Sequence, residues 1–374
     1  MSMPICPILP RRSRHEICLL STGLGRAKAA NRRAKGTILT IISTRAIRAA
    51  AALALASALF AAPARAEDKA AILLPGSIND QSWNALGYSI LLSLKPHGFA
   101  TAYSENVADS EEAEALRDYA AKGYGIVIGH SGRFVSSIEQ VAPDFPKVQF
   151  VVVGGNQGQA PNVMSIDYNN AQFGCQMGTL AARMSKTHKV AGVYGLEGVP
   201  NITAQAGGFR ICARKAGATV AIIYVKDMED AAAAKEAALA LIAGGADVLT
   251  GKLNAAEAGL VQAAKEKGVY VTGRGLDQTA MAPDMVLTNI LEDWPGMFGS
   301  MADKVKAGTL FSTFVLYGYD TAPVTGGKLA YAEGKEFNPI VPAAVVDELH
   351  AMAKDFASGA LKVEPTRDDA KGGS

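Results

Sequence analysis

From Asp68 onward the chain alternates short apolar runs with longer amphipathic helical stretches. The apolar runs are continuous, which is typical of strands in a parallel sheet that helices cover on both faces. The alternation restarts at the long helical stretch that begins at Ala171. Two successive sets predict an α/β protein with two doubly wound parallel-sheet lobes joined by a hinge. A ligand cleft is then expected between the lobes, beyond the carboxyl ends of the strands.

The same pattern predicts how the chain is divided between the lobes. We expect the first lobe to contain residues 67–168 and about 288–312. We expect the second lobe to contain residues 169–287 and about 313–340. Residues 341–374 then form an amphipathic C-terminal helix and a polar, frayed tail.

The charge of the chain is unevenly distributed. Residues 1–66 hold 11 of the 37 Lys and Arg residues and a single acid, Glu16, which leaves 26 basic and 34 acidic residues and a net charge of −8 from Glu67 onward. Phosphate binding needs a positive surface, so this acidic remainder argues against a nucleic-acid partner.

The basic N-terminal stretch is interpreted as a cleavable export signal within residues 1–66. An apolar run over residues 49–62 follows Arg45 and Arg48, and small residues precede Glu67. The positive charges, the apolar run and the small residues follow one another in the order of a signal peptide. The apolar run is also short for a segment that spans a bilayer. A buried helix or a membrane anchor is therefore the weaker alternative. We expect a periplasmic protein, without a lipid anchor because no Cys stands at the cleavage point.

The first 36 residues are irregular and basic, which is unusual for a signal sequence. No Met occurs between Met3 and Met164. We therefore expect translation to start near Leu39, at a non-ATG codon.

Five Gly-containing loops follow predicted strands and should converge at the cleft: GSIND, GHSGRF, GLEGVPN, GKLNAAE and GRGLDQ. Such loops carry the ligand-binding groups of doubly wound sheets. From these loops and the helices that follow them, the candidate ligand-binding residues are Asn79, Asp80, Trp83, Asn84, His130, Ser131, Phe134, Asn201, Gln205, Lys252 and Asp277.

Two aromatic residues at strand-to-helix junctions, Trp83 and Phe134, are expected to offer flat faces to a planar ligand. Asn79, Asp80 and Asn84 would supply donors and acceptors at the ligand edge. The alternative for Trp83 is packing against a neighbouring helix. The adjacent Asn-Asp pair favours a binding site.

Three other loop residues have structural alternatives that the sequence leaves open. His130 is either a polar ligand contact or a solvated loop residue. Arg133 is better explained as a surface or hinge residue than as a ligand contact. Asp277 either binds ligand or caps a helix.

The motifs do not support catalysis or a bound cofactor. GHSGR (Gly129–Arg133) fails the nucleophile-elbow pattern because its fifth residue is Arg133. The four His residues after Glu67 have no metal-site or triad spacing, and no phosphate-binding loop or dinucleotide fingerprint is present. We expect a binding protein, with a hydrolase in the cleft as a distant alternative. Cys175 and Cys212 form either a disulfide or two buried thiols.

From about Ala70 to Gly334 the chain resembles the basic membrane protein (BMP) family of ABC-importer solute receptors. The blocks that carry the resemblance are GSINDQSWNALGY, APDFPKVQFVVV, NVMSIDY, GVPNITAQAGGFRICARKAG, AALALIAGGADVL, and GLDQ with MVLTNILEDW. The resemblance implies the hinged, two-lobed type I periplasmic binding protein fold. It also implies a small-molecule ligand, purine nucleosides in characterised members, and an inner-membrane ABC permease as partner. We expect a monomer.

Matching positions imply that Asp80 and Asn84 contact a base on which Trp83 stacks. The chain departs from the family at two positions that hold the sugar of the ligand. An Asp of the family is replaced by Gly275, and a Lys of the family is replaced by Glu292. A second-lobe aromatic is replaced by Gln205. Loss of the sugar-holding groups favours a smaller planar heterocycle, such as a nucleobase, over an intact nucleoside.

Two other roles use the same fold. A purine nucleoside-binding protein and a periplasmic sensory receptor stay open as alternatives. A transcription regulator is disfavoured by the export signal and by the lack of a DNA-binding segment ahead of the fold.

Overall fold

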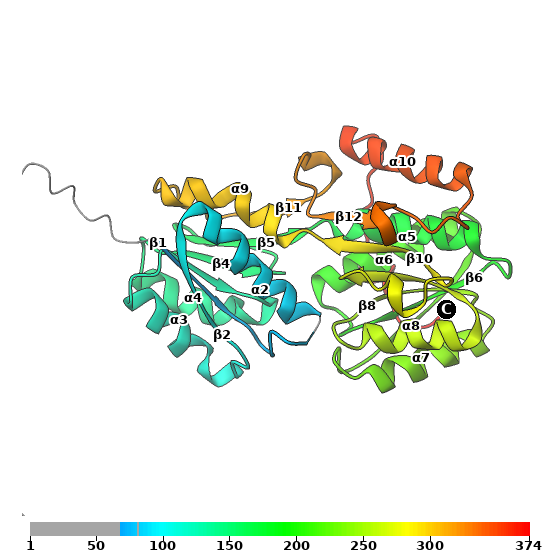
Figure 1. Cartoon of the computed structure of the whole chain (residues 1–374), viewed down its shortest axis with the longest axis horizontal. Coiled ribbons are helices and arrows are strands. Elements are labelled where there is room, and N and C mark those ends of the chain that lie inside the picture. The colour runs from blue at the N-terminus through cyan, green and yellow to red at the C-terminus, as the bar shows by residue number, and fades with distance from the viewer. Residues whose placement is uncertain (1–67, 81) are drawn as a thin grey trace, which may run out of the picture. The chain divides into compact units, whose positions relative to one another are not determined.

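The computed structural model describes residues 68–80 and 82–374 (Figure 1). The predicted export signal and start site lie outside this part of the chain. Among the described residues, no helix has the length and apolar character needed to cross a membrane.

The first lobe is built on a six-stranded sheet in the order β11-β5-β4-β3-β1-β2, and every pairing is parallel. Its strands are β1 (Asp68–Leu73), β2 (Phe99–Ser104), β3 (Ile126–Gly129), β4 (Gln149–Val153), β5 (Val163–Tyr168) and β11 (Phe314–Tyr317). Four of the six, β1, β3, β4 and β5, are largely or wholly buried, as the continuous apolar runs predict.

The second lobe contains a six-stranded sheet in the order β12-β10-β9-β8-β6-β7. All pairings are parallel except that of β10 with β12. Its strands are β6 (Lys189–Tyr194), β7 (Thr219–Tyr224), β8 (Val248–Lys252), β9 (Tyr270–Gly275), β10 (Val286–Glu292) and β12 (Gly327–Ala330). The two sheets confirm the predicted α/β class.

Helices cover both sheets (Figure 1). They are α2 (Trp83–Leu94), α3 (Glu112–Ala121), α4 (Val135–Val141), α5 (Asn170–Met184), α6 (Pro200–Lys215), α7 (Ala231–Ala243), α8 (Glu257–Lys267), α9 (Trp294–Lys306) and α10 (Ala343–Ser358). Helices α2 and α9 lie side by side in the first lobe although they are far apart in the sequence. The chain therefore returns from the second lobe to complete the first.

The chain passes between the lobes at points that differ from two of the predicted boundaries. It leaves the first sheet after Tyr168. Strand β10 then pairs with β9 in the second sheet, and β11 pairs with β5 in the first. The two later crossings therefore follow Glu292 and Tyr317, instead of lying near residues 288 and 313. An apolar run does not reveal which sheet it joins, because strand order depends on distant partners.

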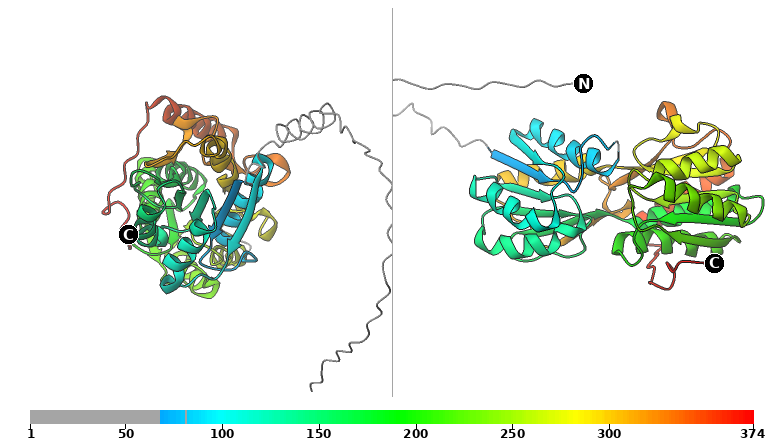
Figure 2. Two further views of the ribbon diagram at one scale, coloured as in Figure 1. Left: turned by 90° about the vertical axis from the view of Figure 1, so that its left-hand side faces the viewer. Right: turned by 90° about the horizontal axis from the view of Figure 1, so that it is seen from below.

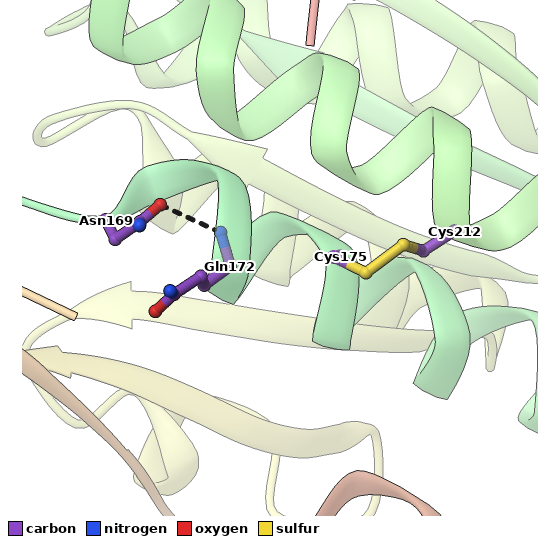
Figure 3. The surroundings of a disulfide bond; sticks show 4 residues. All are labelled: Asn169, Gln172, Cys175 and Cys212. Atoms are coloured by element: carbon purple, nitrogen blue, oxygen red, sulfur yellow. Dashed lines mark hydrogen bonds between the residues drawn. A yellow bond between two sulfur atoms is a disulfide. The ribbon is translucent and has the colours of Figure 1, made fainter. Parts of the chain in front are cut away.

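Helices α5 and α6 of the second lobe pack closely and are joined by a disulfide between Cys175 and Cys212 (Figure 3). Helix α5 begins where the side chain of Asn169 accepts a hydrogen bond from the Gln172 amide (3.2 Å; Figure 3). A Cβ atom at Gly178 would collide with the Phe209 carbonyl of α6, so the helix contact requires glycine there. The disulfide resolves the alternative that the sequence left open.

The C-terminal tail is docked on the second lobe, which corrects the expectation of a frayed tail (Figure 2). Gly373 and Ile222 of the edge strand β7 exchange backbone hydrogen bonds of 2.8 and 3.0 Å. Arg210 donates to the Asp369 and Gly373 carbonyls at 3.2 and 2.8 Å. The polar composition of the tail concealed these backbone contacts.

Candidate functional site

The loop between β1 and α2 is held by the Asp80 carboxylate. It accepts hydrogen bonds from the backbone amides of Ser82, Asn84 and Ala85 at 2.8–2.9 Å, and from the Asn84 side chain at 2.8 Å. Asn84 in turn accepts a hydrogen bond from the Gly76 amide (3.0 Å). Both side chains therefore fix the start of α2, and both also line a cleft cavity of about 540 Å³.

Trp83 is held flat against His130. The ring centroids are 4.1 Å apart and the planes differ by 22°. The Trp83 indole donates to the His130 carbonyl (2.9 Å), and His130 Nε2 lies 2.8 Å from the Trp83 carbonyl. Trp294 meets the indole edge-on at 5.7 Å. Trp83 is half-buried and lines the cleft, so it combines internal packing with a cleft-facing position.

His130 is fully buried, which excludes the solvated-loop alternative. Burial lowers the pKa of its imidazole to about 4, so the ring is neutral at pH 7. A neutral ring must carry its proton on Nε2 to donate to the Trp83 carbonyl. His130 therefore supports Trp83 from behind and lines neither cleft cavity.

Phe134 does not face the cleft, although its place at a strand-to-helix junction predicts that it does. Its side chain is fully buried among the apolar residues of the first-lobe core, and lines no cleft cavity. The short 3-10 turn Gly132–Phe134 directs it against Gly129 and Ile138. The physical reason for the correction is that a large apolar ring at a strand-to-helix junction gains most by joining the core.

Two polar neighbours of Phe134 lie at the cleft surface. Ser131 lines the cleft, and its hydroxyl accepts a hydrogen bond from the Arg133 amide (3.3 Å). Arg133 forms ion pairs with Asp109 (2.7 Å) and Glu112 (2.8 Å). Its guanidinium is therefore bound within the first lobe. This agrees with the expectation that Arg133 is a surface or hinge residue and not a ligand contact.

Three further candidates make hydrogen bonds within the protein or lie at its surface. Asn79 is exposed, and Asp277 accepts from the Thr279 amide (2.9 Å) and the Asn289 side chain (3.1 Å). Gln205 is buried and donates to the Gly251 carbonyl (3.1 Å). None of the three lines the two cleft cavities.

A second cleft cavity, of about 480 Å³, has walls from both lobes. The first lobe contributes Trp83, Ser131, Gly132, Arg133, Val135, Gly154, Gly155 and Asn156, and the second contributes Leu196, Val199, Pro200, Asn201, Ile202, Met228, Lys252, Asn254 and Arg274. Four of the sequence-predicted residues, Trp83, Ser131, Asn201 and Lys252, thus line one cavity.

A buried charge cluster, defined as Asp167, Tyr168, Lys252, Glu257, Arg274 and Glu292, lies beneath the cleft. Lys252 donates to the Tyr168 hydroxyl (2.9 Å), which donates to Glu292 (3.0 Å). Glu292 also pairs with Arg274 and accepts from the Trp294 indole (2.8 Å).

Burial and mutual interaction shift the pKa values in this cluster. Burial raises the pKa of Glu257 to about 8 and that of Asp167 to about 6. Burial, followed by the charge of Arg274, lowers the pKa of Lys252 to about 8. Burial opposes ionisation of Glu292 as well, but Arg274 and Lys252 outweigh it and lower its pKa. At pH 7, Glu292 is ionised and Glu257 is largely neutral.

Sequence reasoning missed Arg274, Tyr168 and Trp294. Arg274 lies within the buried strand β9, where a charged residue requires a partner. A charged residue inside a predicted buried strand was the signal that could have revealed Arg274. The spacing of residues in the sequence could not identify Glu292 as its partner. Within the described residues, no group of three or more His, Cys, Asp or Glu could hold a metal ion.

Comparison with known proteins agrees with this architecture. The model of the Bmp family, described as ABC transporter substrate-binding protein PnrA-like, matches residues 67–333. A solved ABC transporter solute-binding protein from Conexibacter woesei has a TM-score of 0.63 at 25% identity, covering 80% of this chain and 99% of that one.

Relatives in sequence carry different names. The Transcriptional activator protein med of Bacillus subtilis is 25% identical over 272 residues, covering 72% of this chain and 85% of that protein. A purine-binding protein of Brucella abortus is 28% identical over 221 residues, covering 58% of this chain and 62% of that protein. Since the family model spans more than half of the sequence, this chain belongs to the Bmp family of PnrA-like ABC transporter substrate-binding proteins.

Proposed function

We propose that the protein is the periplasmic solute-binding component of an ABC importer and captures a small planar heterocycle by closure of its lobes. The observation that carries this proposal is Trp83, a flat side chain held by His130 and Trp294 at a cavity that both lobes line. Stacking of a base on an aromatic ring contributes about 1–3 kcal/mol.

The groups at the expected sugar positions favour a ligand without ribose. Gly275 has no side chain, and Glu292 is engaged by Arg274, Tyr168 and the Trp294 indole. At these two positions no hydrogen-bonding group is therefore left to hold the sugar hydroxyls. The purine-binding relative from Brucella abortus supports a flat heterocycle as the ligand class.

The proposed role is non-enzymatic. Burial lowers the pKa of His130 to about 4, which makes the ring a weak base and poorly suited to act as a general base for Ser131. The remaining features of the proposal are a monomer, a cleaved export signal without a lipid anchor, and an inner-membrane permease that recognises the closed form.

A thermal-shift screen of residues 67–374 tests the ligand class. The panel contains free purines and pyrimidines, their nucleosides, and other small heterocycles such as B6 vitamers. A ligand that binds only the native state raises the melting temperature. We expect shifts with free heterocycles and none with nucleosides, whereas a nucleoside-only response would contradict the proposal.

A sensory receptor is the second candidate, because one relative is named for regulation, as a transcriptional activator, and not for transport. Uptake of a labelled ligand separates the two roles. Loss of uptake on deletion of the gene supports import, and unchanged uptake supports sensing.

A further inference from the structure

The second-lobe wall of the cleft contains two buried cations. Lys252 ends strand β8 and Arg274 lies near the end of the adjacent strand β9. Both line the 480 Å³ cavity, and they are only 4% and 5% exposed. Paired cations at this depth need an explanation, since a buried charge is costly unless it is compensated.

Lys252 has few partners for its charge. An ammonium group has three donors, and Lys252 uses one of them in a hydrogen bond to the Tyr168 hydroxyl (2.9 Å). The ammonium also lies 4.8 Å from the centre of the Tyr168 ring. Among residues 68–80 and 82–374, no carboxylate lies within ion-pair distance of Lys252.

Arg274 forms an ion pair with Glu292, but one of its N–H donors has no acceptor within the described residues. Its guanidinium pairs with Glu292 and donates to the Leu253 carbonyl (2.5 Å). The Nε donor is buried and, within the part of the chain that the structure describes, has no hydrogen-bond partner. A buried unsatisfied donor carries a desolvation penalty that a ligand acceptor would remove.

The charges of Glu292 and Asp167 partly offset the effect of burial on the pKa of Lys252, but neither carboxylate lies within ion-pair distance of the ammonium, so they leave its remaining donors free. Glu257 is largely neutral at pH 7 because burial raises its pKa to about 8. Asp167 accepts hydrogen bonds from Asn201 (3.1 Å) and from the Tyr168 amide (2.8 Å), and lines a different cavity.

We infer that the ligand is a planar heteroaromatic acid whose oxyanion lies against Lys252 and the free Nε donor of Arg274 while its ring stacks on Trp83. This inference rests on the proposed function and narrows its ligand class. The oxyanion could belong to a carboxylate or to an exocyclic oxygen that shares the charge of a deprotonated ring. Both are planar acceptors of charge-assisted hydrogen bonds.

Calorimetry with matched acid and neutral probes tests the inference. The carboxylate pairs are nicotinate with nicotinamide and orotate with uracil, and the deprotonated-ring pair is urate with hypoxanthine. We expect at least one acid to bind about 10-fold or more tightly than its neutral partner, as a charge-assisted hydrogen bond implies. Which pair responds identifies the source of the oxyanion.

Lys252→Met should remove that preference, and Lys252→Arg should retain part of it. Lys215→Met is the control, because Lys215 is an exposed residue of α6 outside the cleft. Melting temperatures of the variants verify folding. Tight binding of neutral heterocycles with no preference for acids would overturn the inference and leave the proposed function standing, whereas absence of binding by every probe would count against both.

Discussion

The two walls of the cleft are built on different principles. The first-lobe wall presents the flat face of Trp83, which His130 holds in place, and its charged side chains Asp80 and Arg133 are engaged within the lobe itself. The second-lobe wall is charged, with Lys252 and Arg274 buried beside Glu292. If the proposed function is correct, one wall supplies shape and stacking and the other supplies electrostatic selectivity. Folding is therefore expected to depend more on the charged wall, and ligand affinity on both.

The largest expected effect is a loss of folding stability when the second-lobe wall loses one partner of its buried ion pair. Glu292→Gln leaves Arg274 buried without its anion, and breaking a buried pair in this way costs about 3–5 kcal/mol. Urea denaturation measures the loss. The matched control is Glu348→Gln, which removes a partly exposed partner of Arg183 and should cost about 0–1 kcal/mol. Equal effects of the two substitutions would contradict this view of the charged wall.

The disulfide should stabilise the second lobe without shaping the cleft. Cys175 and Cys212 are 37 residues apart, and the chain-entropy relation gives about 3–4 kcal/mol for such a loop. The double variant Cys175→Ala/Cys212→Ala should therefore unfold at lower urea concentration and keep its ligand affinity. A change in affinity at a temperature where the variant is folded would show that the disulfide positions the cleft.

On the first-lobe wall, Trp83→Ala should weaken ligand binding about 10-fold or more, because a stacking contact of about 1–3 kcal/mol is lost. Calorimetry with a heterocycle from the screen measures it. Phe134→Leu is the control, since Phe134 lies in the core and its loss should lower stability but leave affinity unchanged. An unaltered affinity for Trp83→Ala would assign Trp83 to packing alone.

The smallest expected effect is a pH dependence. Because the pKa of Glu257 is raised to about 8, its contribution to stability is full below its ordinary value of 4.5 and is lost as the pH rises through 8. Between about pH 6.5 and 7.5 the free energy of unfolding should fall by about 1 kcal/mol. Glu257→Gln should flatten this slope in urea titrations at the two pH values, and an unchanged slope would assign it to another group.

Much of the fold was predictable because it depends on local pattern. Continuous apolar runs predicted the parallel strands, and the loops after them predicted the place of the cleft. The crossings around β10 and β11 were misplaced, since their apolar runs are compatible with either sheet. The docking of the tail was not predicted either. Gly373 pairs with Ile222 through backbone groups, and backbone groups are the same for every residue type, so composition does not reveal the pairing.

The sequence by itself determined the two-lobed architecture and placed Trp83 at the start of a helix and Lys252 at the end of a strand, both facing a cleft. Only the tertiary structure decided that Phe134 turns into the core and that His130 supports Trp83. It also decided the partners of Glu292, which include Tyr168 at a separation of 124 residues. The physical reason is that periodicity records which face of an element is buried, whereas the pairing of buried charges depends on which distant elements share that face.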